Sequence, residues 1–278
     1  MKVGLRSTSS LSVVFVGRPE LELQTPSTCD WAKTHFVAVG TEWDPAIEAI
    51  KDIAAAVCII FDPYSLTAAQ LAQAPGLKVG VLTHIPSAEE VERLRSLISD
   101  RGFRWFTSPD RGPKEVQALP ILQTLPPLVD AARLPKSPDW AARGHRILAP
   151  TAAPIVGLEK LVPLPSTNDP WAALKALKDS AVMLCAAGSR DLLRLLSLSL
   201  GHLVICEEEL PLHWGFEVEE EYLLCARERW KEILAQLGNA PNSFRAIRIR
   251  AWQKARELFD ASGAFRRLVH DALWLSAS

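Results

Sequence analysis

Short apolar runs alternate with polar segments through the first half of the chain. Residues 12–17 (SVVFVG) and 36–40 (FVAVG) combine β-branched and aromatic residues and each run ends in glycine, which predicts two buried strands. The run 57–63 (VCIIFDP) begins with five apolar residues, as expected of a strand covered on both faces of a sheet. Residues 77–84 and 103–107 predict two further strands.

Helical patterns fill the intervals between these strands. Residues 45–56 and 66–74 have helical composition. Ser87 and Glu90 have the spacing of a capping box, which predicts a third helix over 87–101. Because strands and helices alternate in this order, we predict parallel βαβ units with right-handed crossovers.

The second half of the chain repeats the alternation after a proline-rich connector at 119–138. Its predicted strands and helices lie at 146–149, 170–178, 180–186, 191–200 and 202–206, before a charged helical pattern from 218 to 275. The segment 191–200 (DLLRLLSLSL) is apolar on almost every side, so its helix is expected to be buried between layers. We predict an α/β protein of two Rossmann-like lobes with parallel sheets and a helical C-terminus, divided into residues 1–134 and 135–278.

The composition is that of an ordinary globular protein without a dominant charge. Of 278 residues, 48% are hydrophobic and 23% are charged, and 31 Lys and Arg nearly balance 32 Asp and Glu. Such a chain has no overall field to hold a nucleic-acid backbone, which argues against a nucleic-acid partner but leaves room for a local basic patch. The N-terminal residues lack the apolar core of a signal peptide, and no apolar stretch reaches the roughly 20 residues that span a bilayer. We expect a cytoplasmic protein without a membrane span.

Cysteines and histidines are scattered along the chain. The five cysteines form no CxxC pair, so buried free thiols in a reducing compartment explain them better than disulfides or a metal. The six histidines are equally dispersed, and no metal site is predicted from their spacing. The sequence also lacks GxxxxGK(S/T), GxGxxG and GxSxG, which disfavours a P-loop kinase, a nicotinamide dehydrogenase and a hydrolase.

Gly188, Ser189 and Arg190 stand between a predicted strand and the apolar helix. In open α/β sheets, ligands bind beyond the carboxyl ends of strands, where backbone donors and helix N-termini converge. A small residue, a hydroxyl and a guanidinium at a helix start suit a diphosphate. The alternative is that Ser189 is a helix N-cap and Arg190 a solvated residue of the first turn.

Three further polar residues follow predicted strands. His84 could act as a catalytic base or contact an acceptor hydroxyl, and the alternative is a structural histidine. Asp62 could orient a sugar hydroxyl or simply cap the turn at Pro63. Glu207 begins a run of three glutamates that could meet ribose or sugar hydroxyls, or could form only a solvated loop edge.

From residue 181 onward the elements follow a definite order. They are a strand at 181–186, a loop with Ser189 and Arg190, a helix ending at Gly201, a strand at 203–206, an acidic loop with Pro211, a stretch from Phe216 to Glu220, a helix near 230–237 and a long helical pattern at 246–259. This order resembles the second domain of the two-lobed (GT-B) glycosyltransferases, above all the spore-maturation-protein-like (CgeB-like) group. In the first half, residues 58–63, 78–84 and 122–130 are similar to the family's acceptor domain and to the segment that leads from it into the interdomain linker.

The resemblance implies a GT-B-like fold with an acceptor-side first domain and a second domain that binds a nucleotide sugar. Ser189 and Arg190 would contact the donor's diphosphate, and an unknown acceptor would enter near His84. Transfer would need no metal and no cofactor besides the nucleotide-sugar donor, because positive side chains and helix dipoles stabilise the leaving diphosphate.

One position departs from the family's pattern. Many members carry a glutamate in the helix before the glycine, where this chain has Leu196 upstream of Gly201. Either Glu207 or a neighbour takes over its contact with the donor, or donor binding is lost. The alternative function is therefore a catalytically inactive GT-B-like module that binds a ligand or a protein partner. A third hypothesis is a small-molecule binding protein of two Rossmann-like lobes.

Overall fold

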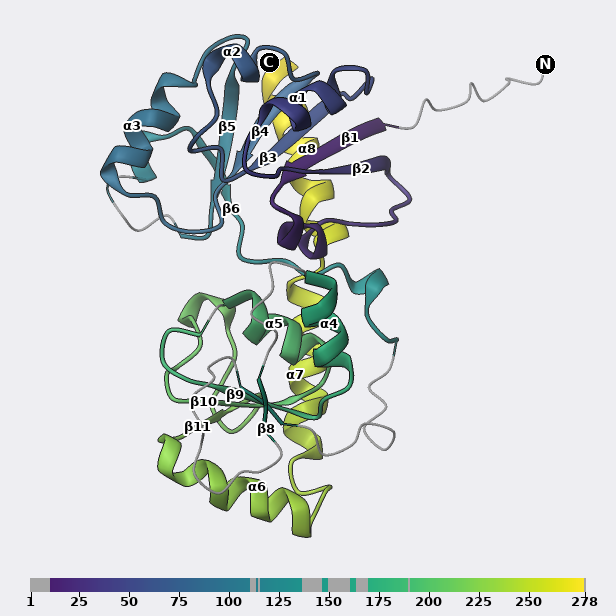
Figure 1. The fold of residues 1–278 in the computed structure, drawn as a ribbon, viewed down its shortest axis with the longest axis vertical. Coiled ribbons are helices and arrows are strands. Elements are labelled where there is room, and N and C mark those ends of the chain that lie inside the picture. The colour runs from purple at the N-terminus through teal and green to yellow at the C-terminus, as the bar shows by residue number, and fades with distance from the viewer. Residues whose placement is uncertain are drawn as a thin grey trace, which may run out of the picture. The chain divides into compact units, whose positions relative to one another are not determined.

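The chain folds into two compact units, drawn as ribbons in Figure 1. The structure, a computed structural model, describes residues 11–110, 114, 116–136, 147–149, 161–163, 170–189 and 191–277. The first unit comprises Met1–Pro126 with Ala261–Ser278, and the second comprises Pro127–Asp260. The junction after Pro126 therefore lies inside the connector that the sequence predicts.

The first unit is built on a six-stranded sheet with the order β2-β1-β3-β4-β5-β6. Its strands are β1 (Leu11–Gly17), β2 (Ala32–Ala38), β3 (Val57–Phe61), β4 (Leu77–Val81), β5 (Phe103–Ser108) and β6 (Ile121–Thr124). Every neighbouring pair runs parallel, which confirms the predicted βαβ organisation. After β2 the chain returns to the other side of β1, so the order of strands reverses there, as in doubly wound folds.

Helices connect these strands. They are α1 (Asp44–Lys51), α2 (Ala68–Leu71) and α3 (Ala88–Ser96), with the short 3-10 helices η1 (Pro19–Gln24) and η2 (Val116–Ala118). The predicted capping box begins α3: the amide of Glu90 donates to Ser87 Oγ at 3.3 Å, and the amide of Ser87 donates to Glu90 Oε2 at 2.7 Å. Two of the amides left without partners at a helix start are satisfied in this way.

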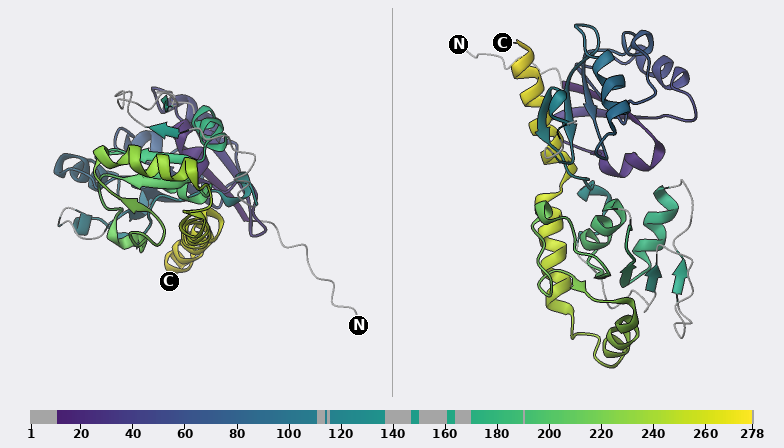
Figure 2. Two further views of the ribbon diagram at one scale, coloured as in Figure 1. Left: turned by 90° about the horizontal axis from the view of Figure 1, so that it is seen from below. Right: turned by 90° about the vertical axis from the view of Figure 1, so that its left-hand side faces the viewer.

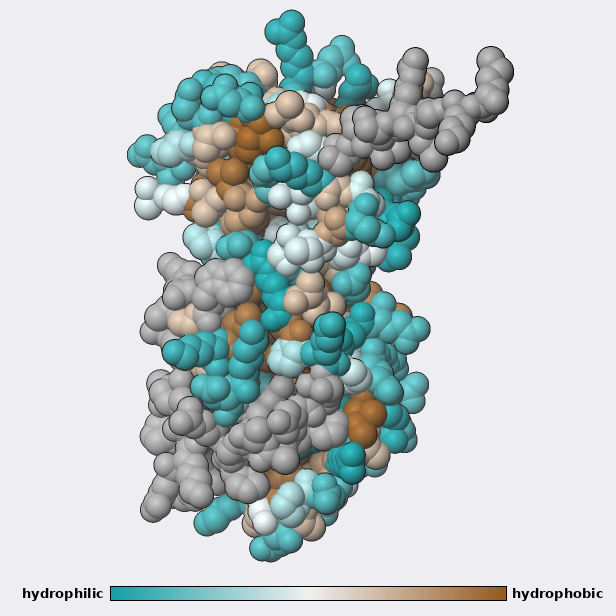
Figure 3. Space-filling model, turned by 90° about the vertical axis from the view of Figure 1, so that its right-hand side faces the viewer, coloured by the Kyte–Doolittle hydropathy of each residue, from teal (hydrophilic) through white to brown (hydrophobic). Residues whose placement is uncertain are grey.

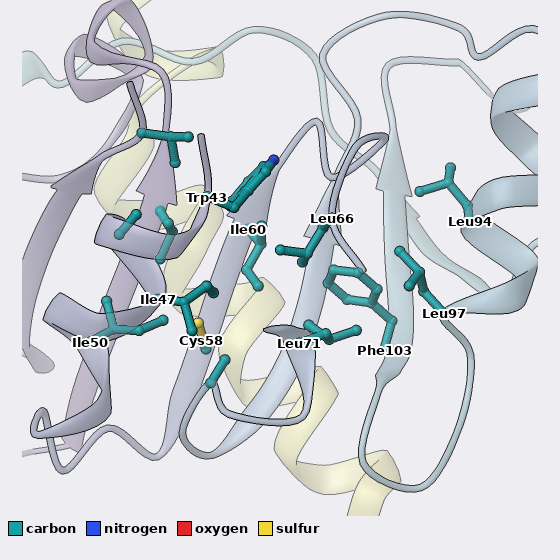
Figure 4. Packing of buried hydrophobic residues seen from close by; sticks show 14 of the residues in the cluster. Trp43, Ile47, Ile50, Cys58, Ile60, Leu66, Leu71, Leu94, Leu97 and Phe103 are labelled. Carbon is teal, nitrogen blue, oxygen red and sulfur yellow. The ribbon is translucent and has the colours of Figure 1, made fainter. Parts of the chain in front are cut away.

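The core of the first unit lies between the sheet and its helices, as Figure 4 shows. Ile50 of α1 and Leu71 of α2 pack in one cluster with Cys58 and Ile60 of β3, and all four side chains are fully buried. Every residue of β3 is buried, which confirms the strand predicted to be covered on both faces.

The second unit has a five-stranded parallel sheet with the order β11-β10-β9-β7-β8. Its strands are β7 (Ile147–Ala149), β8 (Leu161–Pro163), β9 (Val182–Cys185), β10 (Leu203–Cys206) and β11 (Leu223–Leu224). Its helices are α4 (Pro170–Lys178), α5 (Asp191–Ser199), α6 (Trp230–Asn239) and α7 (Arg245–Leu258), with η3 (Ala131–Arg133), η4 (Leu212–Trp214) and η5 (Arg227–Arg229). In α5 all six residues from Arg194 to Ser199 are buried, which confirms the helix predicted to lie between layers.

Three short strands lie where the sequence predicts none. They are β6, inside the proline-rich connector, and β8 and β11 in the second unit. None is longer than four residues, so the alternation of apolar and polar positions is too brief to reveal them.

The final helix, α8 (Ala261–Ala277), belongs to the first unit, whereas the sequence analysis assigns residues 135–278 to one domain. Phe265 is fully buried, and its ring centroid lies 4.9 Å from that of Phe15 and 6.2 Å from that of Phe61. The indole N–H of Trp31 also donates to Ser262 Oγ at 3.3 Å. Figure 2 shows α8 running along the sheet of the first unit. These tertiary contacts, which local periodicity does not encode, decide which sheet the helix covers.

The exposed surface carries scattered apolar side chains. Large hydrophobic residues with substantial exposure are Ile85, Ile98, Leu212, Val218, Leu258, Trp274 and Leu275. On the face drawn in Figure 3, small apolar areas lie among hydrophilic residues. Within the part of the chain that the structure describes, no helix combines the length and apolar character needed to cross a membrane. All five cysteines are free thiols, and Cys58, Cys185 and Cys206 are buried.

Replacing Phe265 by Ala should destabilise the first unit by about 3–5 kcal/mol, because the substitution leaves a cavity in a closely packed aromatic cluster. Leu275→Ala on the same helix removes a side chain that is 45% exposed and should cost less than about 1 kcal/mol. Urea unfolding of both variants measures the difference. Equal midpoints for the two variants would show that α8 does not anchor this unit.

Candidate functional site

The parallel pairing of β9 with β10 brings two loops of the second unit together. Cys185, the last residue of β9, is aligned with Cys206, the last residue of β10. The chain then continues into Ala187 and Gly188 on one side and into the glutamates that begin at Glu207 on the other. These loops leave the carboxyl edge of the sheet, where parallel α/β folds bind their ligands.

At this edge, carboxylates accept hydrogen bonds from backbone amides. Glu207 Oε2 accepts from the amide of Ala187 at 3.0 Å, and Glu208 Oε2 accepts from the amide of Gly188 at 3.1 Å. Arg227 holds Glu207 in a bidentate contact, with Nε 2.9 Å from Oε1 and Nη2 3.0 Å from Oε2. Two consecutive amides therefore each hold one carboxylate oxygen.

Arg194, on the first turns of α5, completes this group. Its side chain is 5% exposed, and Nη2 lies 3.6 Å from Glu208 Oε2 while Nη1 lies 3.7 Å from Asp191 Oδ1. Both distances exceed those of hydrogen bonds, so these contacts are ion pairs. Arg194 Nε has no hydrogen-bond partner among the described residues. A buried guanidinium normally finds more partners than this, so the hydrogen-bonding capacity of Arg194 is incompletely satisfied within the described residues.

We call this set of six residues the carboxylate–amide cluster. Its members are Ala187, Gly188, Arg194, Glu207, Glu208 and Arg227. The hydrogen bond from Arg227 is the main cause that lowers the pKa of Glu207, and the amide of Ala187 adds to it against the opposing effect of burial. Burial raises the pKa of Asp191, although Arg194 and His213 oppose that shift.

Of the residues predicted to contact a diphosphate, the structure brings Gly188 to the cluster. Gly188 has φ of 73°, in the left-handed region that favours glycine, and this turn presents its amide to Glu208. Ser189 forms a turn instead of a helix cap: its hydroxyl donates to the carbonyl of Ala186 at 2.6 Å. Arg190 lies outside the described residues.

Glu207 also lies in the cluster, but its oxygens already bind Arg227 and Ala187. Leu196, at the position where a glutamate is expected from the resemblance, is 2% exposed and forms part of the core. Arg194 and Arg227 are not among the residues predicted from the sequence, and Glu208 is predicted only as part of the run of three glutamates. An isolated arginine in an otherwise apolar, buried helix was the available signal for Arg194, because a buried charge requires a partner.

In the first unit, the structure brings the predicted residues Asp62 and His84 together. Asp62 follows β3 with φ of 44°, and it joins the ends of two strands through Thr83. Its Oδ1 accepts from the Thr83 amide at 2.9 Å, and its Oδ2 accepts from the Thr83 hydroxyl at 2.6 Å. His84 Nδ1 then lies 3.9 Å from Asp62 Oδ1. Asp62 thus caps the loop after β4 rather than the turn at Pro63.

His84 is half-exposed and lies between two carboxylates. Its Nε2 is 3.4 Å from Glu90 Oε1, on the side away from Asp62. The ring of Tyr64 lies 4.9 Å from the imidazole, and the guanidinium of Arg18 lies 3.6 Å from Asp62 Oδ2. Each ring nitrogen of His84 therefore faces a carboxylate, while half of the side chain remains open to solvent. Among the described residues, no group of three or more His, Cys, Asp or Glu side chains could hold a metal ion.

Two parallel Rossmann-like units followed by C-terminal helices define the GT-B class of fold, the fold of the two-lobed glycosyltransferases. No protein-family model matches the chain, and no curated protein matches it by sequence. The spore-maturation-protein-like group therefore stays a prediction.

Solved structures share this fold. Anabaena HepE in complex with UDP and glucose matches with a TM-score of 0.57 and 10% identity over 96% of this chain and 100% of HepE. Sucrose-phosphate synthase from Thermosynechococcus elongatus matches with a TM-score of 0.56 and 10% identity over 96% and 100%. UDP-N-acetylglucosamine 2-epimerase matches with a TM-score of 0.53 and 12% identity over 97% of each chain. At these identities the likeness shows the fold alone.

Replacing Glu207 by Gln should make folding less sensitive to acid. Because the folded-state pKa of Glu207 lies below its ordinary value of 4.5, its carboxylate stabilises the fold above that pH. This stabilisation is lost as the pH falls through the lowered pKa. The urea midpoint of the wild type should therefore fall more between about pH 6 and about pH 3 than that of Glu207→Gln. Glu209→Gln, at the exposed neighbouring position, should respond like the wild type; an unchanged acid response in Glu207→Gln would refute the assigned role.

Proposed function

We propose that the chain binds a nucleotide-sugar donor through its second unit and transfers the sugar to an acceptor without a metal. The observation that carries this proposal is the pair of consecutive amides at Ala187 and Gly188, each bound to a carboxylate oxygen that also contacts an arginine, at the carboxyl edge of a parallel sheet. The fold supports it, since HepE, which shares the fold, is known in complex with UDP-glucose. Amides and guanidinium groups together are what diphosphate sites require.

On the donor side, the reaction needs stabilisation of a leaving diphosphate. Gly188, Ser189 and Arg190 would face the phosphates at the start of α5, and fixed amides with cationic side chains would stabilise the charge that develops as the glycosidic bond breaks. Glu207 would meet ribose or sugar hydroxyls. Although Glu207 already accepts from Arg227 and Ala187, a carboxylate has about four acceptor positions, so it retains capacity for a hydroxyl.

On the acceptor side, His84 would take the proton of the attacking hydroxyl. The acceptor oxygen forms a bond to the anomeric carbon, the bond from that carbon to the diphosphate breaks, and the proton moves to the imidazole. Asp62, 3.9 Å from His84 Nδ1, would help to orient the imidazole and would orient a sugar hydroxyl.

Two observations favour an alternative, a catalytically inactive GT-B-like module that binds a ligand or a protein partner. Leu196 takes the place of the glutamate expected in α5, and the amides of Ala187 and Gly188 are engaged by the chain's own carboxylates. The epimerase that shares the fold also illustrates that this architecture serves more than glycosyl transfer.

Calorimetric titration with UDP, GDP and their sugars tests the proposal. We expect binding of at least one nucleotide diphosphate, and Arg190→Ala should weaken it by about 1.5–3 kcal/mol, the scale of a hydrogen bond to a charged group. Absence of binding at millimolar nucleotide would favour the inactive module. An unchanged affinity in Arg190→Ala would exclude Arg190 from the diphosphate site.

Replacing His84 by Asn should lower glycosyl transfer by about 100- to 10,000-fold, the contribution of a positioned general base, while nucleotide affinity stays unchanged. Transfer is measured as nucleotide release from the bound sugar donor with a panel of hydroxyl acceptors. His270→Asn, on an exposed position of α8, serves as the matched control. Wild-type transfer rates in His84→Asn would exclude His84 as the base.

A further inference from the structure

We infer that Glu208 is an internal anion that occupies a phosphate position, so that a diphosphate ligand must displace it to bind. Glu207 stays in place beside this position when the ligand binds, because Arg227 and the Ala187 amide hold its carboxylate. The inference rests on the proposed nucleotide site in the second unit, and it assigns to Glu208 control over access to that site. It follows from the contacts of the carboxylate–amide cluster.

Each carboxylate supplies one oxygen that a backbone amide and an arginine hold jointly. Glu207 Oε2 lies 3.0 Å from the amide of Ala187 and 3.0 Å from Arg227 Nη2. Glu208 Oε2 lies 3.1 Å from the amide of Gly188 and 3.6 Å from Arg194 Nη2. An oxyanion held between a backbone amide and a guanidinium is also how proteins hold phosphate oxygens. The position of Glu208 Oε2, the less tightly held of the two, therefore suits a phosphate oxygen.

The two carboxylates are held with unequal strength. Glu207 has a side chain that is 19% exposed and makes the bidentate contact with Arg227. Glu208 has a side chain that is 52% exposed and accepts one hydrogen bond, from Gly188, beside the longer ion pair to Arg194. Glu208 can therefore turn into solvent at a smaller cost than Glu207.

Arg194 cannot follow Glu208 into solvent, because its own side chain is 5% exposed. When Glu208 turns away, the buried guanidinium keeps only the 3.7 Å ion pair to Asp191, and its Nε still lacks a hydrogen-bond partner among the described residues. A buried cation that has lost a partner in this way attracts an incoming anion strongly. The free amide of Gly188 would point to the same place.

The negative charge of Glu208 works against the binding of a diphosphate. The carboxylate of Glu208 lies where the diphosphate would bind, with Oε2 3.1 Å from the Gly188 amide and 3.6 Å from Arg194 Nη2. A diphosphate adds further negative charge, so like-charge repulsion and competition for Gly188 act together. Replacing Glu208 by Gln removes the repulsion and weakens the competing contact.

UDP titrated calorimetrically into the wild type, Glu208→Gln and Glu209→Gln at one ionic strength tests the inference. Glu208→Gln should bind UDP about tenfold more tightly than the wild type, a difference of about 1.4 kcal/mol. Glu209→Gln removes the same charge from the exposed neighbour and should change affinity by less than about twofold. Because Glu208 is exposed, the variant should fold, and its urea midpoint checks this.

The outcomes separate this inference from the proposed function. Equal UDP affinity in the wild type and Glu208→Gln would overturn the inference and leave the proposed nucleotide site standing, and so would an equal gain in Glu209→Gln. UDP binding seen only in Glu208→Gln would support the inference but would make the native chain the inactive module. Absence of UDP binding in all three proteins would overturn both.

Discussion

The parallel hydrogen-bonded pairing of β9 with β10 is the constraint on which the candidate site depends. Because Cys185 and Cys206 end their strands in register, the amides that follow one strand meet the glutamates that follow the other. A parallel ladder places both ends at one edge, which no pair of antiparallel neighbours would do. The buried arginine of α5 and the arginine of η5 then find carboxylates within reach. The chemistry of the cluster is thus a consequence of strand register.

In the first unit, too, a pair of parallel neighbouring strands, β3 and β4, brings the residues that follow them together. The loops after β3 and β4 meet at one edge, where Asp62 binds Thr83 and approaches His84. In this unit a carboxylate fixes the geometry of a loop and leaves an imidazole half-exposed beside it. In the second unit, carboxylates instead cover backbone donors. The two edges therefore differ: one leaves a half-exposed imidazole near a carboxylate, and the other holds backbone amides and arginines on carboxylates.

The sequence predicts the alternation of strands and helices well, because apolar runs such as those of β3 and β10 are strong local signals. It fails for β6, which four residues define, and for α8, whose place is decided by the packing of Phe265 on Phe15. At the site, both loops follow strands that the sequence predicts, and the topology brings the Gly188 amide to Glu208. It does not reveal that Arg227, twenty residues after Glu207, forms the bidentate contact, because that pairing depends on the path of the intervening loop.

A crystal structure of the chain with UDP is the sharpest test of the anion site after β9, in which the Gly188 amide and Arg194 bind an anion and the carboxylate of Glu208 fills that place. We expect phosphate oxygens within hydrogen-bond distance of the Gly188 amide and the Arg194 guanidinium, with the side chain of Glu208 turned into solvent. A bound nucleotide whose phosphates lie elsewhere, with Glu208 still on Gly188, would contradict it.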